Sequence, residues 1–257
     1  MQELIKAEIT IDGVMLLTLN RAEKRNALNN ATLQYLCELL EQAEHNARVK
    51  AIVLTGNQYC FAAGADLAEL AEMDTVALQL DIRPKLWQKI DAFSKPIIAA
   101  VNGYALGAGF ELVLHTDIVL CGENAKFALP EIGLGMLPGA GGTQRLARLV
   151  GQQLTMRWAM TGEMISAKQA QQHGICSEVV PTALTVEYAM QLASKIAKQA
   201  PLAIRVIKQS IKSIHEITLS QGLKSERQNF VWLAATKDRN EGINAFFEKR
   251  KPVFRGE

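Results

Sequence analysis

The chain has 257 residues, of which 49% are hydrophobic and 21% are charged, a composition typical of a soluble globular protein with one large core. Its formal net charge is +2 and its basic residues are scattered, which argues against a nucleic-acid-binding protein but suits a polyanionic small ligand. The sequence shows neither an export signal nor an apolar run of about 20 residues, the length that crosses a bilayer, so we expect a cytoplasmic protein that contacts no membrane.

Strand and helix signals alternate in the N-terminal part of the chain. Asn30 is a candidate cap for a helix over about 31–45, where apolar residues recur at helical spacing, and a second helix is predicted over about 107–115. Short apolar runs closed by turn residues predict strands at Val14–Leu19, Ala51–Thr55, Ile97–Val101 and Ile118–Cys121. Strands that alternate with helices indicate an α/β core.

Beyond about residue 152 the strand signals fade, apart from Val179-Val180, and long amphipathic helices are predicted. The expected spans are 152–160, 185–199, 201–213, 217–235 and 239–248. Helices added to a core that is already closed are typical of an assembly region, so we expect no second catalytic domain there.

The four cysteines give no sign of a metal site or of a disulfide framework. Cys37, Cys60, Cys121 and Cys176 lie at wide, irregular spacing, without a C-x-x-C pair or a His-rich segment. We therefore expect reduced, mostly buried thiols and no bound metal.

Glycines are concentrated in residues 95–145, which hold nine of the 18 glycines in the chain. This stretch contains neither a G-x-G-x-x-G dinucleotide motif nor the lysine of a phosphate-binding P-loop. Gly107-Ala108-Gly109 instead begins a predicted helix, whose first amides lack partners within the helix and carry partial positive charge. The small-residue turn at 61–67 enters another helix, and one amide from each place would stabilise the oxyanion formed at a thioester carbonyl.

Glu111 and Glu131 are the candidate acid and base. Both have apolar sequence neighbours, a setting that raises carboxyl pKa values, and together they would hold one water. From the residues alone, Glu111 also fits a solvated helix position and Glu131 a capping or loop position. Glu111 and His115 have the spacing of two metal ligands on a helix, but without a third ligand an ordinary helix-face contact is the better interpretation. No Gly-x-Ser-x-Gly motif supports a serine hydrolase.

Several motifs together resemble the crotonase, or enoyl-CoA hydratase/isomerase, superfamily over essentially the whole chain. They are Leu19-Asn20-Arg21, Asn26-Ala27-Leu28 and the runs at 61–66, 98–103 and 138–145. The resemblance implies an α/β fold with a spiral core of repeated ββα units over 1–195 and a C-terminal helical trimerisation region over 196–257. It also implies assembly as a homotrimer or a homohexamer.

The resemblance places Glu111 and Glu131 at the two catalytic positions and implies syn hydration of the 2,3 double bond of a short 2-enoyl-CoA. Glu111 would act on the water as base, Glu131 would supply the proton to Cα, and the main-chain amides of Ala65 and Ala108 would form the oxyanion hole. Gly139 would help to seat the water. No cofactor is expected beyond the coenzyme A of the substrate itself.

The resemblance also implies substrate contacts from two turns and from a neighbouring subunit. The expected contacts to the water and the acyl part are Asp66 and Leu67, and those to coenzyme A are Arg25, Ala27, Ala63 and, from the neighbouring subunit, Lys249. The stretches at 81–87 and 104–109 are similar to bacterial hydratases of phenylacetate breakdown, which indicates an acyl chain with a terminal carboxylate.

Three alternatives remain at the level of sequence. They are a general short-chain fatty acyl hydratase, a Δ3,Δ2-isomerase and a crotonase-fold protein that binds RNA. Isomerases of the superfamily commonly keep only the glutamate that matches Glu131, and the small net charge argues against RNA, so hydration is favoured.

Overall fold

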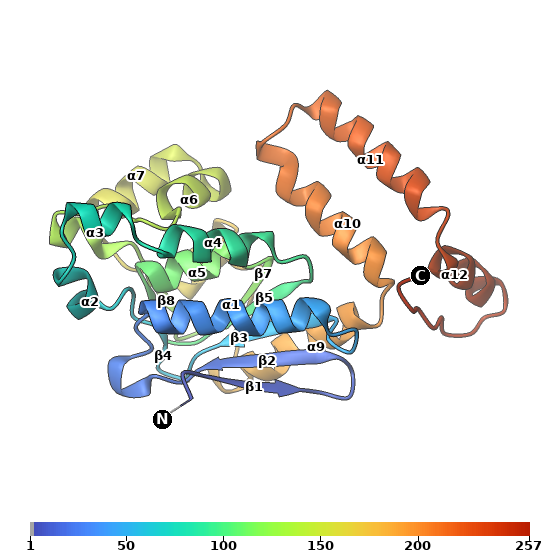
Figure 1. The fold of residues 1–257 in the computed structure, drawn as a ribbon, viewed down its shortest axis with the longest axis horizontal. Coiled ribbons are helices and arrows are strands. Elements are labelled where there is room, and N and C mark those ends of the chain that lie inside the picture. Colours follow the sequence, from blue (N-terminus) through green and yellow to red (C-terminus); the bar gives the residue numbers. More distant parts are fainter. Residues whose placement is uncertain (1–2) are drawn as a thin grey trace.

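The computed structural model describes residues 3–257, whose strands form two sheets (Figure 1). The larger sheet has the strand order β1 (Ile5–Ile9), β2 (Val14–Leu19), β3 (Ala51–Thr55), β5 (Ile97–Val101), β7 (Ile118–Gly122), β10 (Glu178–Val180). The smaller sheet has the order β4 (Cys60–Ala62), β6 (Tyr104–Leu106), β8 (Lys126–Ala128), β9 (Ile165–Ser166). Neighbouring strands are parallel except in two pairs, β1 with β2 and β8 with β9.

Three successive strand pairs give the core a repeating plan. In β3–β4, β5–β6 and β7–β8 the first strand joins the larger sheet, the second joins the smaller sheet, and helical segments follow. These segments are α2 (Leu67–Ala71), α3 (Thr75–Gln79) and α4 (Arg83–Ala92) after β4, α5 (Ala108–His115) after β6, and η2 (Pro130–Leu134), α6 (Gly142–Val150) and α7 (Gln152–Thr161) after β8. Because β4, β6 and β8 are parallel, the segments that leave them meet at one edge of the smaller sheet. The predicted spiral of ββα units is confirmed.

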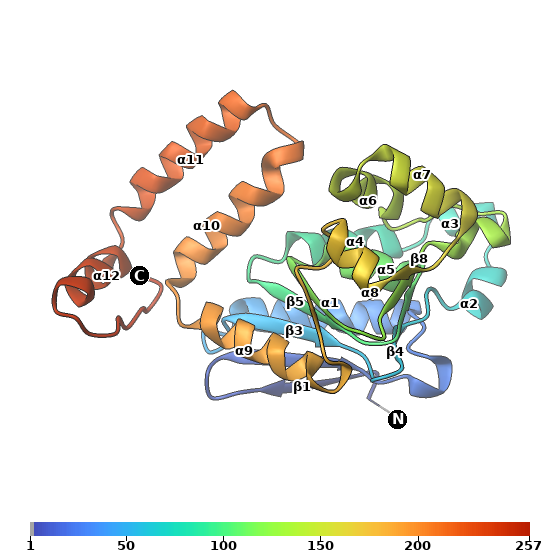
Figure 2. The ribbon, with the colours of Figure 1, turned by 180° about the vertical axis from the view of Figure 1, so that it is seen from behind.

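Helices cover both faces of the larger sheet (Figures 1 and 2). The apolar stripe of α1 (Asn30–His45) belongs to the main core on one face, together with α4 and α5. On the other face lies α9 (Thr185–Ala197), and α8 (Ala167–Gln172) connects β9 to β10. Small side chains at every fourth position bring α9 close to β3 and β5: Ala189, Ala193 and Ala197. Both strands are therefore buried on both sides, as their apolar sequences predict.

The start of α1 differs by one residue from the expectation. Asn29, not Asn30, is the cap, because its backbone is extended and its Oδ1 accepts a hydrogen bond from the Thr32 N–H at 2.9 Å. Asn30 is the first helical residue, and its N–H donates to Glu69. Two consecutive asparagines offer the same capping chemistry, so the sequence alone does not distinguish them.

A C-terminal arm, which we define as residues 201–257, extends from the core and comprises α10 (Pro201–Lys212), α11 (Leu219–Leu233), α12 (Lys237–Phe247) and a tail (Figures 1 and 2). Two lysines fasten α10 to the core: Lys208 Nζ lies 2.7 Å from Asp117 Oδ2, and Lys212 Nζ lies 2.9 Å from Asp91 Oδ1. The second helix, α11, packs against α10 and away from the sheets. The arm is helical, as the periodicity predicts.

All four cysteines are free and buried, as expected, and the sulfur atoms of Cys121 and Cys176 lie 3.2 Å apart. Across residues 3–257, the helices are all too short or too polar to span a membrane. The same part of the chain holds no group of three or more histidine, cysteine or acidic side chains arranged for a metal ion.

Candidate active site

A cavity of about 350 Å³ lies where the segments that leave β4, β6 and β8 meet. Residues 63–65 and 107–108 line it from the strand ends, while α2 to α4 and the segment 130–140 provide further walls. Glu111 and Glu131 both line the cavity, as predicted. Much of the remaining wall is apolar and includes Leu28, Leu33, Leu70, Pro84, Trp87 and Leu134. The protein therefore places Glu111 and Glu131 in a largely apolar chamber, whose only other charged lining residues in the described chain are Asp81 and Arg83.

Glu111 lies in the first turn of α5 and is only 2% exposed. Its Oε1 accepts hydrogen bonds from the N–H groups of Ala140, at 2.7 Å, and Gly142, at 2.8 Å. Burial raises the pKa of Glu111, and the two amide donors offset part of this rise because they stabilise the ionised form. Among the described residues no donor reaches Oε2, which leaves this oxygen for a water in the cavity.

Glu131 lies in η2 and has fewer partners. Its Oε2 is buried and makes no hydrogen bond to any residue that the structure describes. Burial, with a smaller contribution from the nearby charge of Glu111, raises the pKa of Glu131 to about 7. At neutral pH this carboxyl is thus partly protonated, which is the state that a proton donor needs.

Gly107 connects the second carboxylate to the start of α5. Its backbone angles, φ 49° and ψ −125°, belong to a region that side chains disfavour. A Cβ at this position would also lie 2.8 Å from Glu131 Oε1. The carboxylate of Glu131 therefore packs directly against the turn that carries Ala108, and any side chain at Gly107 would displace it.

Ala65 and Ala108 both line the same cavity, and the partners of their main-chain N–H groups can be traced. Leu28 forms a parallel bridge with Ala65, in which its N–H donates to Gly64 O and its C=O accepts from Asp66 N–H, so the N–H of Ala65 points to the opposite side. Ala108 is the first residue of α5, and its N–H has no partner within the helix. No acceptor in residues 3–257 takes either N–H, so both are available to an oxyanion.

Comparison with known proteins agrees with this geometry. A family model described as enoyl-CoA hydratase/isomerase matches residues 10–257. The chain belongs to the enoyl-CoA hydratase/isomerase family.

Several enoyl-CoA hydratases are similar to this chain over most of its length. The chain is 56% identical to the 2,3-dehydroadipyl-CoA hydratase of Escherichia coli (strain K12), and the match covers 95% of each protein. It is 44% identical to the mitochondrial enoyl-CoA hydratase of Pongo abelii, over 94% of this chain and 83% of that protein. Among solved structures, the enoyl-CoA hydratase of Bacillus anthracis matches with a TM-score of 0.95 and 38% identity, over 99% of this chain and 100% of that one.

In this member of the enoyl-CoA hydratase/isomerase family, His115 supports Glu111, a role that the sequence did not reveal. His115 Nε2 lies 3.0 Å from the carbonyl oxygen of Ala140, the residue whose N–H binds Glu111. The imidazole ring stacks on Trp87, with the ring centroids 5.1 Å apart. Glu111 and His115, four residues apart on α5, therefore hold the loop at Ala140 through its N–H and its carbonyl oxygen. Their spacing on the helix was the only sign of this role of His115 in the sequence.

The predicted substrate contacts divide into two groups. Ala63, Leu67 and Gly139 line the cavity. Asp66 does not line it, because its Oδ2 forms an ion pair with Arg21 at 3.1 Å, which lowers the pKa of Asp66.

The remaining predicted contacts lie outside the cavity lining. The carbonyl of Arg25 accepts the N–H of Ala63 at 3.0 Å, so the segment with Arg25 and Ala27 borders the strand end that carries Ala63. Lys249 follows α12, which lies far from α2 and α3 in both views. A contact from Lys249 to substrate in the same chain is therefore excluded, and the roles of all these residues stay predictions.

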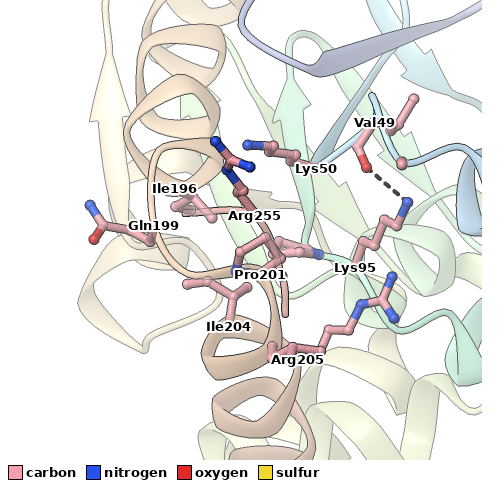
Figure 3. A pocket seen from close by; sticks show the side chains of 13 residues that line it. Val49, Lys50, Lys95, Ile196, Gln199, Pro201, Ile204, Arg205 and Arg255 are labelled. Carbon is pink, nitrogen blue, oxygen red and sulfur yellow. Dashed lines mark hydrogen bonds between the residues drawn. The ribbon is translucent and has the colours of Figure 1, made fainter. Parts of the chain in front are cut away.

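A second cavity, of about 180 Å³, lies between the core and the arm (Figure 3). Lysine and arginine side chains line it, and no carboxylate is among its lining residues. Lys95, one of these cations, donates from Nζ to the carbonyl oxygen of Val49 at 2.8 Å. Without an acid–base pair, this cavity offers no site for hydration chemistry.

Proposed function

We propose that the protein is an enoyl-CoA hydratase that adds water syn across the 2,3 double bond of a short 2-enoyl-CoA and forms the 3-hydroxyacyl-CoA. The single observation that carries this proposal is the cavity itself, which is lined both by the carboxylates of Glu111 and Glu131 and by two residues whose main-chain N–H groups have no acceptor in the described chain. Isomerisation of a double bond needs one proton carrier, whereas addition of water is served by two. Both carboxylates are present, which favours hydration.

The environments of the two carboxylates suggest their roles. Two amides stabilise the ionised form of Glu111, so Glu111 acts as base and takes a proton from water while the oxygen bonds to Cβ. The pair of electrons from the double bond moves toward the thioester, whose oxygen becomes an enolate bound by the N–H groups of Ala65 and Ala108. One such donor contributes about 3 to 4 kcal/mol to transition-state stabilisation.

Glu131 completes the reaction. Its raised pKa keeps a proton available near neutral pH, and transfer of that proton to Cα collapses the enolate to the saturated thioester. The proton taken up by Glu111 is then exchanged with solvent, and Glu131 is reprotonated in the same way. Because water supplies every atom that is added, the proposed reaction uses no cofactor beyond the coenzyme A of the substrate.

For the acyl chain we propose 2,3-dehydroadipyl-CoA, a substrate of phenylacetate breakdown. The similarity to the Escherichia coli enzyme of that name, at 56% identity over 95% of both chains, supports this choice. A cytoplasmic location accords with the four free thiols.

We also propose that the arm assembles the protein as a homotrimer, or as a homohexamer of paired trimers. Large apolar side chains on α11 and α12 are exposed in the single chain: Phe230 is 65% exposed, Trp232 53% and Phe246 78%. Large exposed apolar side chains gathered on one part of a chain are typical of an interface. In the assembly, Lys249 of a neighbouring copy would contact the coenzyme A.

A substrate panel tests the activity. Loss of absorbance at the enoyl thioester band is measured with 2,3-dehydroadipyl-CoA, crotonyl-CoA and a 3-enoyl-CoA. We expect hydration of the first two, with the higher kcat/KM for 2,3-dehydroadipyl-CoA, and little conversion of the third. Efficient conversion of the 3-enoyl-CoA alone would favour the isomerase, and tight RNA binding without turnover would favour the binding protein.

A further inference from the structure

Arg83 is the one cation that lines the active-site cavity among the residues that the structure describes. It lies at the start of α4 and is 9% exposed. Its neighbours in the lining are mostly apolar, for example Leu70, Leu78 and Pro84. A buried guanidinium costs free energy unless it is paired, so its presence in this wall calls for an explanation.

The protein holds the guanidinium from one side. Arg83 Nε lies 2.9 Å from Asp81 Oδ2, and Arg83 Nη2 lies 3.6 Å from Glu69 Oε2 and 3.3 Å from Met73 Sδ. Within residues 3–257, neither N–H of Nη1 has an acceptor. The group is therefore fixed in orientation and retains two donors on one nitrogen, enough for a carboxylate oxygen.

Arg83 lies on the same wall of the cavity as Trp87. Arg83 and Trp87 both line the cavity and are four residues apart on α4, so they share one face of the helix and differ by about 6 Å along its axis. Trp87 stacks on His115, which contacts the loop that binds Glu111. Arg83 thus lies one helical turn along α4 from Trp87, which contacts the residues that hold Glu111. A few carbon–carbon bonds of the acyl chain beyond the substrate Cβ would span this separation.

We propose that Arg83 forms a subsite for a carboxylate at the end of the acyl chain, an inference that rests on the proposed hydratase function. A chain that ends in a methyl group would bury the two Nη1 donors without a partner, which is costly. A terminal carboxylate accepts from them instead. Asp81 and Glu69 neutralise the guanidinium in the empty site, so the subsite selects between acyl chains more than it tightens binding overall.

The competing explanation is purely structural. Asp81 Oδ1 accepts the N–H of Arg83 at 3.0 Å, so the pair also fixes the start of α4. If that were its only task, removal of the guanidinium would slow the reaction of every enoyl-CoA by the same factor. A carboxylate subsite changes the ratio between substrates.

The test compares 2,3-dehydroadipyl-CoA with 2-hexenoyl-CoA, which has the same chain length and a terminal methyl group. In Arg83→Met, we expect the ratio of the two kcat/KM values to fall roughly 30-fold, because charge-assisted hydrogen bonds to the carboxylate are lost. The matched control is Lys85→Met, which removes an exposed cation of the same helix that does not line the cavity, and should leave the ratio unchanged. Arg83→Lys keeps the charge without the fork of donors and should give an intermediate ratio.

A measurement on the unmodified protein makes the test independent of variant folding. The methyl ester of the 2,3-dehydroadipyl chain should be hydrated roughly 30-fold less efficiently than the free acid. Equal rates for ester and acid, or equal losses for both substrates in Arg83→Met, would overturn the subsite and leave the hydratase intact. Failure of the unmodified protein to hydrate 2-hexenoyl-CoA and 2,3-dehydroadipyl-CoA alike would instead remove the hydratase proposal, and the subsite with it.

Discussion

The core buries its large apolar residues, whereas the C-terminal arm exposes several of its own. In the core, Phe61, Phe110 and Phe127 are completely buried, whereas on the arm Phe230 and Phe246 are mostly exposed. The core therefore completes its own packing, and it carries Glu111, Glu131 and the amides of the proposed oxyanion hole on that packed frame. The arm leaves part of its apolar surface exposed in the single chain, and in the proposed assembly a second copy covers it.

The polar attachment of α10 fits this division. Lys208 and Lys212 reach back to aspartates of the core, so the first helix of the arm has a fixed direction. Asp91 faces His115, Lys212 and Arg145, and its contacts with these three side chains lower the pKa of Asp91. The same His115 contacts the loop that binds Glu111. A continuous series of polar contacts therefore connects the arm, through Asp91 and His115, to Glu111.

Removal of either carboxylate should give the largest effect and tests whether the core holds the complete chemistry. Glu111→Gln and Glu131→Gln are each expected to lower turnover by roughly 100-fold or more, because general acid–base catalysis needs a group that exchanges protons. Turnover is measured at saturating enoyl-CoA. A near-wild-type rate in either variant would contradict the assigned roles.

Binding and fold provide the control for both variants. Glutamine keeps the shape of glutamate, and in Glu111→Gln its amide oxygen still accepts from Ala140 and Gly142. Calorimetric titration with a saturated acyl-CoA should show affinity within about threefold of wild type. A loss of binding as large as the loss of turnover would mean that the carboxylates hold the substrate and do not perform the chemistry.

The sequence predicted the long helices, the longer strands and both carboxylates, but not which other residues line the cavity. β2, β3 and β5 have the bounds that their apolar runs indicated. The strands of the smaller sheet escaped prediction because two or three residues show no periodicity. The small-residue turns at 61–67 and 107–109 indicated where oxyanion amides would lie, and the assignment to Ala65 and Ala108 came from the family resemblance, because a side-chain pattern does not show which main-chain N–H is free. The ion pair of Arg83 with Glu69 depends on how α2 and α4 pack, which the local sequence does not specify.

A charge on the arm should give the next largest effect and tests its dependence on a second copy. We expect Phe230→Asp to convert the proposed trimer to a monomer, because burial of an unpaired carboxylate in an apolar interface is costly. If a neighbour contributes to the coenzyme A site, KM should rise about tenfold while turnover changes less. Light scattering after gel filtration gives the mass, and steady-state kinetics give KM.

The control for the arm is an aromatic residue on the core surface. Tyr59 is 72% exposed, so Tyr59→Asp makes the same kind of change outside the arm and should leave the trimer mass as it is. An unmodified protein that is monomeric at micromolar concentration would contradict the assembly role of the arm.

The two carboxylates of the core also differ from each other, and this difference should appear in stability. Glu111 has two amide donors, while Glu131 has a buried oxygen without a partner in the described residues. Burial raises the pKa of Glu131 from 4.5 to about 7. Between these values the folded protein binds more protons than the unfolded chain, so its stability falls as pH rises. The contribution is fully present below pH 4.5 and is lost as the pH passes 7.

Glu131→Gln removes this dependence because glutamine stays neutral. At pH 8.5 we expect the variant to melt about 2–4 °C above wild type, a modest gain because the cavity admits solvent on one side. At pH 4.5 the two proteins should melt at the same temperature. Glu111→Gln should gain less at pH 8.5, since the amides that stabilise its carboxylate make ionisation less costly there. Melting is followed calorimetrically at equal protein concentration, which keeps the contribution of assembly constant. An equal gain in both variants would show that burial alone, and not the missing hydrogen-bond donors, sets the cost of ionised Glu131.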